Sequence, residues 1–223
     1  MNEEISQHVL KTGTLTIGIV CKEGIVVAAD RRQSYGAQCG GVSYIALSAK
    51  KIEEINERMI ATTAGTASDS RKVLEIIRAE LRLKELKTKE KVSVKETASF
   101  MSNMVFQNIR TPSMIPSISH FLLAGFDDKG VHLFDISPDG YLEETNDYSA
   151  TGAGLVQAHP ILDSEFKKDM SVEEGIKLVV KCVKASMNRE PSVGNGIDVF
   201  VVKQGEVKQV IGQETSFNFK EQK

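Results

Sequence analysis

The pair Gly13-Thr14 has residue types that could form the centre of a nucleophilic site. It begins an apolar run, residues 14–20, and Asp30 and Lys51 follow as possible partners. A threonine hydroxyl alone is a poor nucleophile, but a threonine at a chain's N-terminus has its own α-amine, with a pKa of about 7.7–8.0, as the base. Cleavage before Thr14 would therefore combine nucleophile and base in one residue. The alternatives are a threonine that only packs in a strand and an Asp30–Lys51 pair that is only structural.

The apolar runs predict strands that are covered on both faces. Residues 14–20 and 25–30, joined by a short turn that ends in Gly24, are typical of a β-hairpin. Residues 25–29 are apolar at every position, as in a strand buried on both faces. Three later runs behave similarly, at residues 59–64, 121–126 and 197–202.

Four segments with helical spacing or helix caps could supply the covering layers. A helix is expected from Ser68 or Asp69 to about residue 86, and capping boxes at Ser93 and Ser171 predict helices to about residues 108 and 188. A shorter helix is expected over residues 154–166. The order of strands, two helices, strands, two helices and strands predicts an α+β fold, a four-layer α-β-β-α sandwich in one domain.

The composition excludes several classes of protein. With 223 residues, 41% hydrophobic and 26% charged, the chain is typical of a globular protein, and its net charge of −2 disfavours binding to nucleic acid or an anionic membrane. No run approaches the roughly 20 apolar residues of a membrane helix. Cys21, Cys39 and Cys182 form no CxxC pair, and the histidines show no metal-ligand spacing. We therefore expect a cytoplasmic protein with free thiols.

The ordered motifs resemble the β-type subunits of the proteasome core particle, most closely the archaeal kind. These motifs are Thr14-x-Thr-x-Gly, Val27-Ala-Ala-Asp-x-Arg32, Lys51-Ile, Thr62-Thr-Ala-Gly-x-x-x-Asp69 and Gly194-x-Gly-Ile-Asp198. The likeness extends from Thr14 to about Val202. It implies the N-terminal-nucleophile hydrolase fold, which is the four-layer sandwich already expected.

The resemblance also implies a threonine endopeptidase that is made as a precursor. The propeptide would be residues 1–13, removed autocatalytically between Gly13 and Thr14, followed by a subunit domain at 14–210 and a polar tail at 211–223. Lys51 matches a lysine whose cation favours deprotonation of the Thr14 hydroxyl, and Asp30 matches the aspartate that positions that lysine. Gly65 matches the glycine whose N–H meets the developing oxyanion. No metal or organic cofactor is implied.

A substrate pocket and a set of partners follow from the same resemblance. The partners are α-type and other β-type subunits in stacked rings, an unfolding ATPase that acts indirectly, and unfolded polypeptide as substrate. Glu53 and Arg71 would either pair with each other or select charged side chains. The pocket residues would be Gln33, Ala49, Glu53, Thr63, Ala67 and Arg71.

Three departures from the family pattern leave alternatives open. Ala153 and Val193 stand where the family has serines, and Glu190 replaces an aspartate of the same supporting network; Ser192 is one position early. On this basis, serines at positions 153 and 193 would raise the rate. A glycine-containing insertion, with Gly36, Gly40 and Gly41, lengthens the segment before Lys51.

Ala153 and Val193 favour an alternative, a β-type subunit of little or no activity that builds the ring, whereas the retained Gly13, Thr14, Asp30 and Lys51 favour the active endopeptidase. Two further alternatives are another N-terminal-nucleophile amidohydrolase and the bacterial ATPase-linked relative of the proteasome.

Overall fold

The structure, a computed structural model, describes residues 13–35, 44–46, 48–114 and 116–215. Residues 1–12 of the expected propeptide, the three glycines of the insertion, Cys39 and the end of the expected tail lie outside this part.

Two antiparallel sheets and four helices form the described chain, together with a small hairpin of β3 and β4. The strand order is β11-β1-β2-β12-β13 in the first sheet and β10-β9-β8-β6-β5 in the second, where β7 also pairs with β8. The bounds are β1 (Thr16–Cys21), β2 (Gly24–Asp30), β3 (Gln33–Tyr35), β4 (Tyr44–Ala46), β5 (Ile52–Asn56), β6 (Met59–Thr62), β7 (Ala64–Gly65), α2 (Ala67–Thr88), α3 (Val94–Arg110), β8 (Ser119–Asp127), β9 (Gly130–Ile136), β10 (Leu142–Thr145), β11 (Tyr148–Thr151), α4 (Leu155–Glu165), α5 (Val172–Met187), β12 (Gly196–Lys203) and β13 (Glu206–Glu214).

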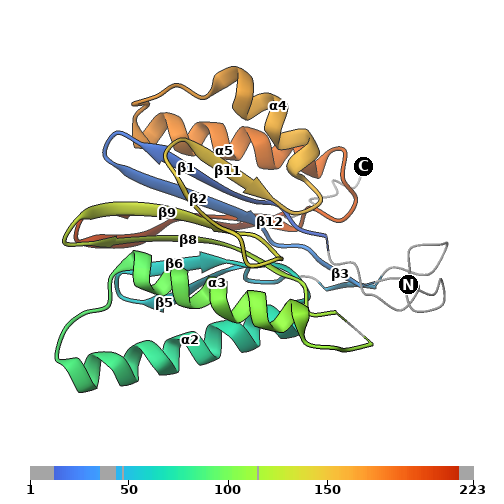
Figure 1. Ribbon diagram of the computed structural model, residues 1–223. Coiled ribbons are helices and arrows are strands. Elements are labelled where there is room, and N and C mark those ends of the chain that lie inside the picture. Colours follow the sequence, from blue (N-terminus) through green and yellow to red (C-terminus); the bar gives the residue numbers. More distant parts are fainter. Residues whose placement is uncertain (1–12, 36–43, 47, 115, 216–223) are drawn as a thin grey trace, which may run out of the picture.

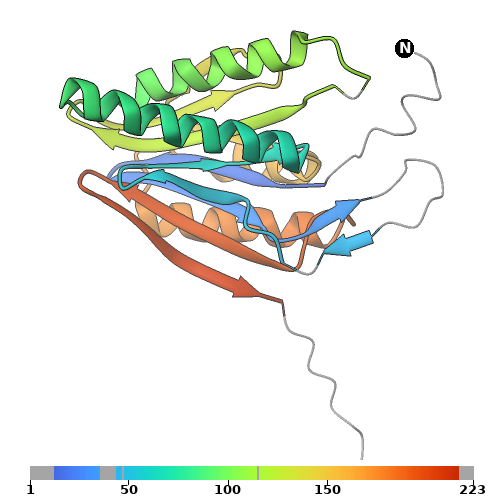
Figure 2. The same cartoon turned by 90° about the horizontal axis from the view of Figure 1, so that it is seen from below.

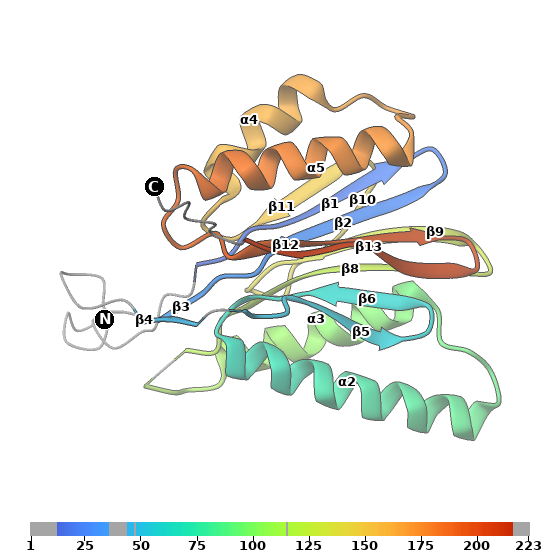
Figure 3. The ribbon, with the colours of Figure 1, turned by 180° about the vertical axis from the view of Figure 1, so that it is seen from behind.

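The elements stack in four layers, which confirms the predicted sandwich. Figure 1 shows α4 and α5 over the first sheet, the two sheets face to face, and α2 and α3 beneath the second sheet. Seen from below, α2 and α3 run side by side across that sheet (Figure 2). Figure 3, from behind, shows β12 and β13 of one sheet facing β5 and β6 of the other.

Strand β2 shows why its sequence is apolar throughout. All of its residues are buried, and alternate side chains belong to different layers of the core. Val26 and Ala28 face the cluster beneath α4 and α5, while Ile25, Val27 and Ala29 face the cluster between the two sheets. A strand with helices on one side and a second sheet on the other has no polar face.

The two capping boxes are confirmed, but the first helix begins earlier than expected. Ser93 and Ser171 each accept a hydrogen bond from the backbone N–H three residues on, and the glutamate there returns one. Helix α2 begins at Ala67 after Thr66, which makes no side-chain cap. The Thr66 N–H donates instead to the carbonyl of Ile118, just before β8, so this helix begins where the chain pairs with a segment distant in the sequence.

Strand β13 extends past the expected domain boundary at residue 210. It pairs antiparallel with β12 along its whole length, from Lys203 opposite Glu206 to Gly196 opposite Glu214. Its side chains are mostly exposed because it forms the edge of the first sheet. The polar composition after Val210 therefore reflects an exposed edge strand as far as Glu214, where we had expected a tail.

Candidate active site

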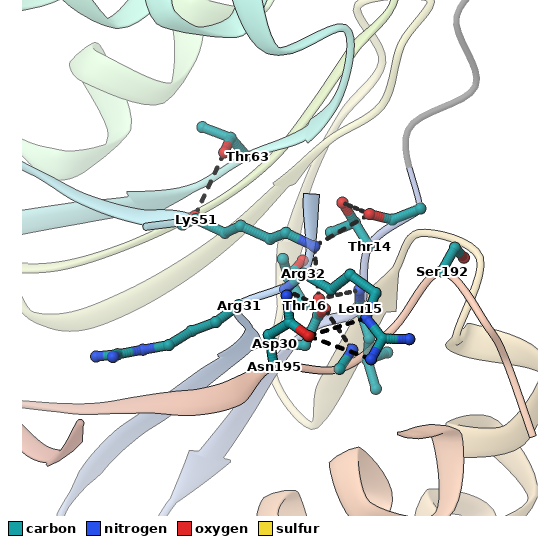
Figure 4. Close-up of polar contacts among 12 residues, drawn as sticks. Thr14, Leu15, Thr16, Asp30, Arg31, Arg32, Lys51, Thr63, Ser192 and Asn195 are labelled. Carbon is teal, nitrogen blue, oxygen red and sulfur yellow. Dashed lines mark hydrogen bonds and ion pairs between the residues drawn. The ribbon is translucent and has the colours of Figure 1, made fainter. Parts of the chain in front are cut away.

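The β1–β2 hairpin brings the end of β2 next to the residues that precede β1. Asp30 and Leu15 are bonded twice: the Asp30 N–H donates to the Leu15 carbonyl at 3.1 Å, and the Leu15 N–H donates to Asp30 Oδ1 at 2.9 Å. Lys51 lies directly before β5 in the other sheet and extends its side chain toward Asp30 and Thr14 (Figure 4). Three residues far apart in the sequence thus meet where the two sheets face each other.

Asp30 is fully buried, and its carboxylate accepts four hydrogen bonds. Oδ1 accepts from Leu15 N and, at 2.7 Å, from Lys51 Nζ. Oδ2 accepts from the backbone N–H groups of Arg32 at 3.0 Å and Gly194 at 2.9 Å. Both oxygens are therefore saturated, as a buried carboxylate requires.

Lys51 is almost completely buried, and its ammonium group has two acceptors. Besides Asp30 it donates to the Gly13 carbonyl at 3.1 Å. Burial lowers the pKa of Lys51 below the usual value of 10.5, and the nearby Asp30 carboxylate acts in the opposite direction. A lysine shifted in this way is closer to the range in which it can exchange a proton.

Thr14 is buried, and both of its oxygens are held. Its hydroxyl donates to the Gly13 carbonyl at 2.7 Å, and its own carbonyl accepts from Gly154 N at 3.1 Å. Gly152, with φ of +94°, approaches so closely that an added Cβ would lie 2.2 Å from the Thr14 carbonyl oxygen. Ala153, between these two glycines, is exposed.

Gly65 ends β7, and its position requires glycine. Its φ is +104°, and an added Cβ would lie 2.3 Å from the Ile118 carbonyl oxygen. Gly65 lines the same cavity as Gly13, Thr14 and Lys51.

This cavity of about 210 Å³ brings together every residue expected in the substrate pocket. Glu53 and Arg71 do not pair with each other there. Glu53 is bonded to Arg78 at 2.7 Å, and Arg71, whose side chain is 75% exposed, pairs with Glu75 at 3.3 Å. The six expected residues on its wall are Gln33, Ala49, Glu53, Thr63, Ala67 and Arg71.

The loop between α5 and β12 contains two of the residues that depart from the family pattern, Glu190 and Val193. Glu190 Oε1 accepts from Ser192, from its N–H at 3.1 Å and from its hydroxyl at 2.5 Å. Val193 is fully buried in the apolar cluster beneath α4 and α5. Val193 is therefore a core residue, whereas Ser192 lies next to Gly13, where an added Cβ would meet its side chain.

Arg32 holds this loop against the site, a role that the sequence did not reveal. Its guanidinium donates to the Pro191 carbonyl at 2.6 Å and, through Nε and Nη2, to Asn195 Oδ1 at 3.2 Å (Figure 4). Gly194 packs directly on it, since an added Cβ would lie 2.6 Å from the guanidinium carbon. The feature of the sequence that could have indicated this role is an arginine two residues after Asp30.

A buried chain of threonine hydroxyls, also missed from the sequence, links the sheets beside the site. Thr16 shares a hydrogen bond of 2.9 Å with Thr151 and accepts one of 3.2 Å from Thr62. Thr62 in turn accepts from the Leu122 N–H at 3.0 Å. All three threonines are fully buried. Their signal in the sequence is a hydroxyl within an otherwise apolar strand.

In the described part of the chain, no three His, Cys, Asp or Glu side chains gather in a way that could hold a metal ion. Cys21 and Cys182 are buried free thiols, and burial raises the pKa of each to about 12. None of the described helices has the length and apolar character needed to cross a membrane.

Comparison with known proteins identifies the family. Residues 10–202 match the family model described as "Proteasome subunit". "Proteasome subunit beta" of Archaeoglobus fulgidus is 33% identical over 91% of this chain and 91% of its own length, and that of Methanocaldococcus vulcanius is 32% identical over 91% and 87%. "Proteasome subunit beta 2" of Pyrobaculum calidifontis is 35% identical over 91% and 92%. The chain therefore belongs to the proteasome subunit family, as a β-type subunit of the core particle.

Proposed function

We propose that this β-type subunit is a threonine endopeptidase whose nucleophile is the hydroxyl of Thr14. The observation that carries the proposal is the convergence of the Thr14 hydroxyl and the Lys51 ammonium on one peptide carbonyl, that of Gly13. A nucleophile beside a carbonyl that a buried cation polarises is the arrangement that peptide cleavage needs.

The first reaction is release of Thr14 itself. Thr14 Oγ1 attacks the carbonyl carbon of Gly13, the carbon–nitrogen bond breaks, and the nitrogen takes up the hydroxyl proton. Water then hydrolyses the resulting ester, which leaves a Gly13 carboxylate and a free Thr14 amine. Lys51 supports the attack through its hydrogen bond to the carbonyl oxygen. Gly65, on the wall of the same cavity, is the proposed source of a backbone N–H for the oxyanion.

Turnover then follows the same chemistry on other chains. The free amine takes the hydroxyl proton as Thr14 attacks a substrate carbonyl, while the Lys51 cation stabilises the attacking oxygen, and the proton then passes from the Thr14 amine to the leaving amine. Water clears the acyl-enzyme. The cavity beside Thr14 would hold the side chain that precedes the cleaved bond. Asp30 keeps Lys51 in place through their 2.7 Å contact.

We propose unfolded polypeptide as the substrate. The partners would be α-type and other β-type subunits in stacked rings, with an ATPase that unfolds substrates acting indirectly, and the location would be the cytoplasm. Family membership supports these assignments.

One observation favours a second candidate function, a structural subunit of low activity. Ala153 is exposed between Gly152, which lies close to the Thr14 carbonyl, and Gly154, which donates to it, at the position where the family pattern has a serine. The site then has one hydroxyl fewer beside its nucleophile.

The intact mass of the chain in particles assembled with its α-type partner separates the two functions. Loss of residues 1–13, together with retention of those residues in Thr14→Ala particles, supports the peptidase. A chain that keeps its first 13 residues in a fully assembled particle favours the structural role. Hydrolysis of peptides by purified Thr14→Ala particles at the parent rate would contradict the assignment of the nucleophile.

A further inference from the structure

We propose that Ser192 is a positioning residue for self-cleavage, because its side chain restricts residue 13 to glycine and thereby fixes the bond that is cut. The inference rests on the proposed release of Thr14. On this inference, a loop that is distant in the sequence determines which residue can stand before the cleaved bond.

The contact between Ser192 and Gly13 leaves no room for a side chain at position 13. An added Cβ on Gly13 would lie 1.8 Å from Ser192 Cβ and 2.0 Å from its Oγ. Carbon atoms that are not bonded to each other approach to about 3.5–4.0 Å. Rotation of the serine hydroxyl cannot relieve the overlap, since the nearer of the two atoms is Cβ, which rotation does not move.

Ser192 is held in place next to Gly13, because Ser192 itself and the residues on both sides of it make further contacts. Glu190 binds both its N–H and its hydroxyl. On the two sides of Ser192, the Pro191 carbonyl is bonded to the Arg32 guanidinium and Val193 is buried in the core. The loop is thus held at several points around the serine.

A side chain at position 13 would therefore displace residue 13 itself. Its carbonyl lies 2.7 Å from the Thr14 hydroxyl and 3.1 Å from Lys51 Nζ, both within the normal range of hydrogen bonds. A displacement of about 1 Å at a reacting group can cost about 10²-fold in rate. Ser192 would in this way couple the identity of residue 13 to the speed of release.

The test compares three variants with the unsubstituted chain in particles assembled with the α-type partner. Gly13→Ala adds the Cβ that overlaps with Ser192. Gly13→Ala/Ser192→Gly removes the overlapping atoms and leaves only a 2.8 Å approach to the Ser192 Cα. Gly13→Ala/Ser192→Ala is the matched control, because it removes the hydroxyl but keeps the Cβ at 1.8 Å. The time course of the intact mass gives the rate of release, and thermal unfolding checks that each particle is folded.

We expect Gly13→Ala to slow release about 10²-fold, from the cost of displacing the carbonyl. The Ser192→Gly double variant should recover part of that loss, since a 2.8 Å approach to the Ser192 Cα remains, and the Ser192→Ala double variant should recover none. This difference separates a steric restriction from a general effect on the loop, which both double variants would share.

Two results would overturn the inference alone: release of folded Gly13→Ala at the parent rate, or equal rates for the two double variants. In both cases the unsubstituted chain is still processed, so the proposed function stands. Retention of residues 1–13 by the unsubstituted chain would overturn the proposed function and, with it, this inference.

Discussion

Replacement of Asp30 by asparagine tests how much of the site's stability depends on one buried carboxylate. The side chain is fully buried and accepts from Lys51 and from the backbone N–H groups of Leu15, Arg32 and Gly194. Asparagine has nearly the same shape but only one accepting oxygen, and its amide nitrogen is a donor. Two of the four donors would therefore face another donor.

The cost can be worked out from these contacts. A hydrogen bond to a charged group contributes about 1.5–3 kcal/mol, so loss of two of them costs about 3–6 kcal/mol. Removal of one partner from a buried ion pair costs about 3–5 kcal/mol, and this loss overlaps with the first, since Lys51 would share in both. For a domain of this size, a change of 1 kcal/mol shifts the melting temperature by about 2–4 °C, so we expect a decrease of about 6–24 °C.

Thermal and denaturant unfolding of the purified chain measure this effect. Asp128→Asn is the matched control, because the Asp128 side chain is exposed. Lys51→Met is a useful comparison, because it abolishes release but leaves the three backbone donors to Asp30 in place. It should also destabilise by about 3–5 kcal/mol, because it leaves the buried Asp30 carboxylate without its cation. If Asp30→Asn unfolds at the same temperature as the control, the assignment of Asp30 as the structural centre of the site is refuted.

The remaining predictions concern pH, specificity and the core. Release should become slower as pH rises, with a midpoint below 10.5, because Lys51 supports the attack as a cation that donates to the Gly13 carbonyl and burial lowers its pKa. The initial rate of mass loss across pH checks this, and Lys51→Met should not release at any pH. Because Arg71 lines the cavity, peptides with arginine before the cleaved bond should be hydrolysed a few-fold more slowly than those with leucine or glutamate. Arg71→Glu should reduce this ratio of rates, but only modestly, because the Arg71 side chain is largely exposed. Val193→Ser should lower the free energy of unfolding by about 1–3 kcal/mol instead of raising the rate, since it places a hydroxyl in an apolar cluster. Thr16→Val should cost about 1–3 kcal/mol in denaturant unfolding, because it removes a hydrogen-bond partner from two buried hydroxyls.

The sequence predicted the layers because their signals are local. Apolar runs and capping boxes depend on neighbouring residues alone, and the two boxes at Ser93 and Ser171 begin helices where expected. The motif resemblance pointed to Thr14, Asp30 and Lys51, which do meet in the structure.

Features that depend on contacts between distant segments were not predictable in this way. The start of α2 is set by pairing with Ile118, and the end of β13 by pairing with β12. Adjacent residues in the loop before β12 have different surroundings: the Ser192 side chain lies next to Gly13, whereas Val193 packs in the core. The sequence alone could not show which of the two faces the site, because this depends on how Arg32 and Asp30 hold the loop.

The positions in the chain of the groups that hold Asp30 and Thr14 indicate what cleavage of the precursor would change at the site. The groups that hold Asp30 come from Leu15, Arg32, Lys51 and Gly194, and the Thr14 carbonyl is held by Gly154. All of them lie on the C-terminal side of the bond that would be cut. Among the described contacts, cleavage would remove those that the Gly13 carbonyl accepts from Lys51 and from the Thr14 hydroxyl. Both groups would lose this acceptor, and the carbonyl of a substrate can take the place that Gly13 leaves.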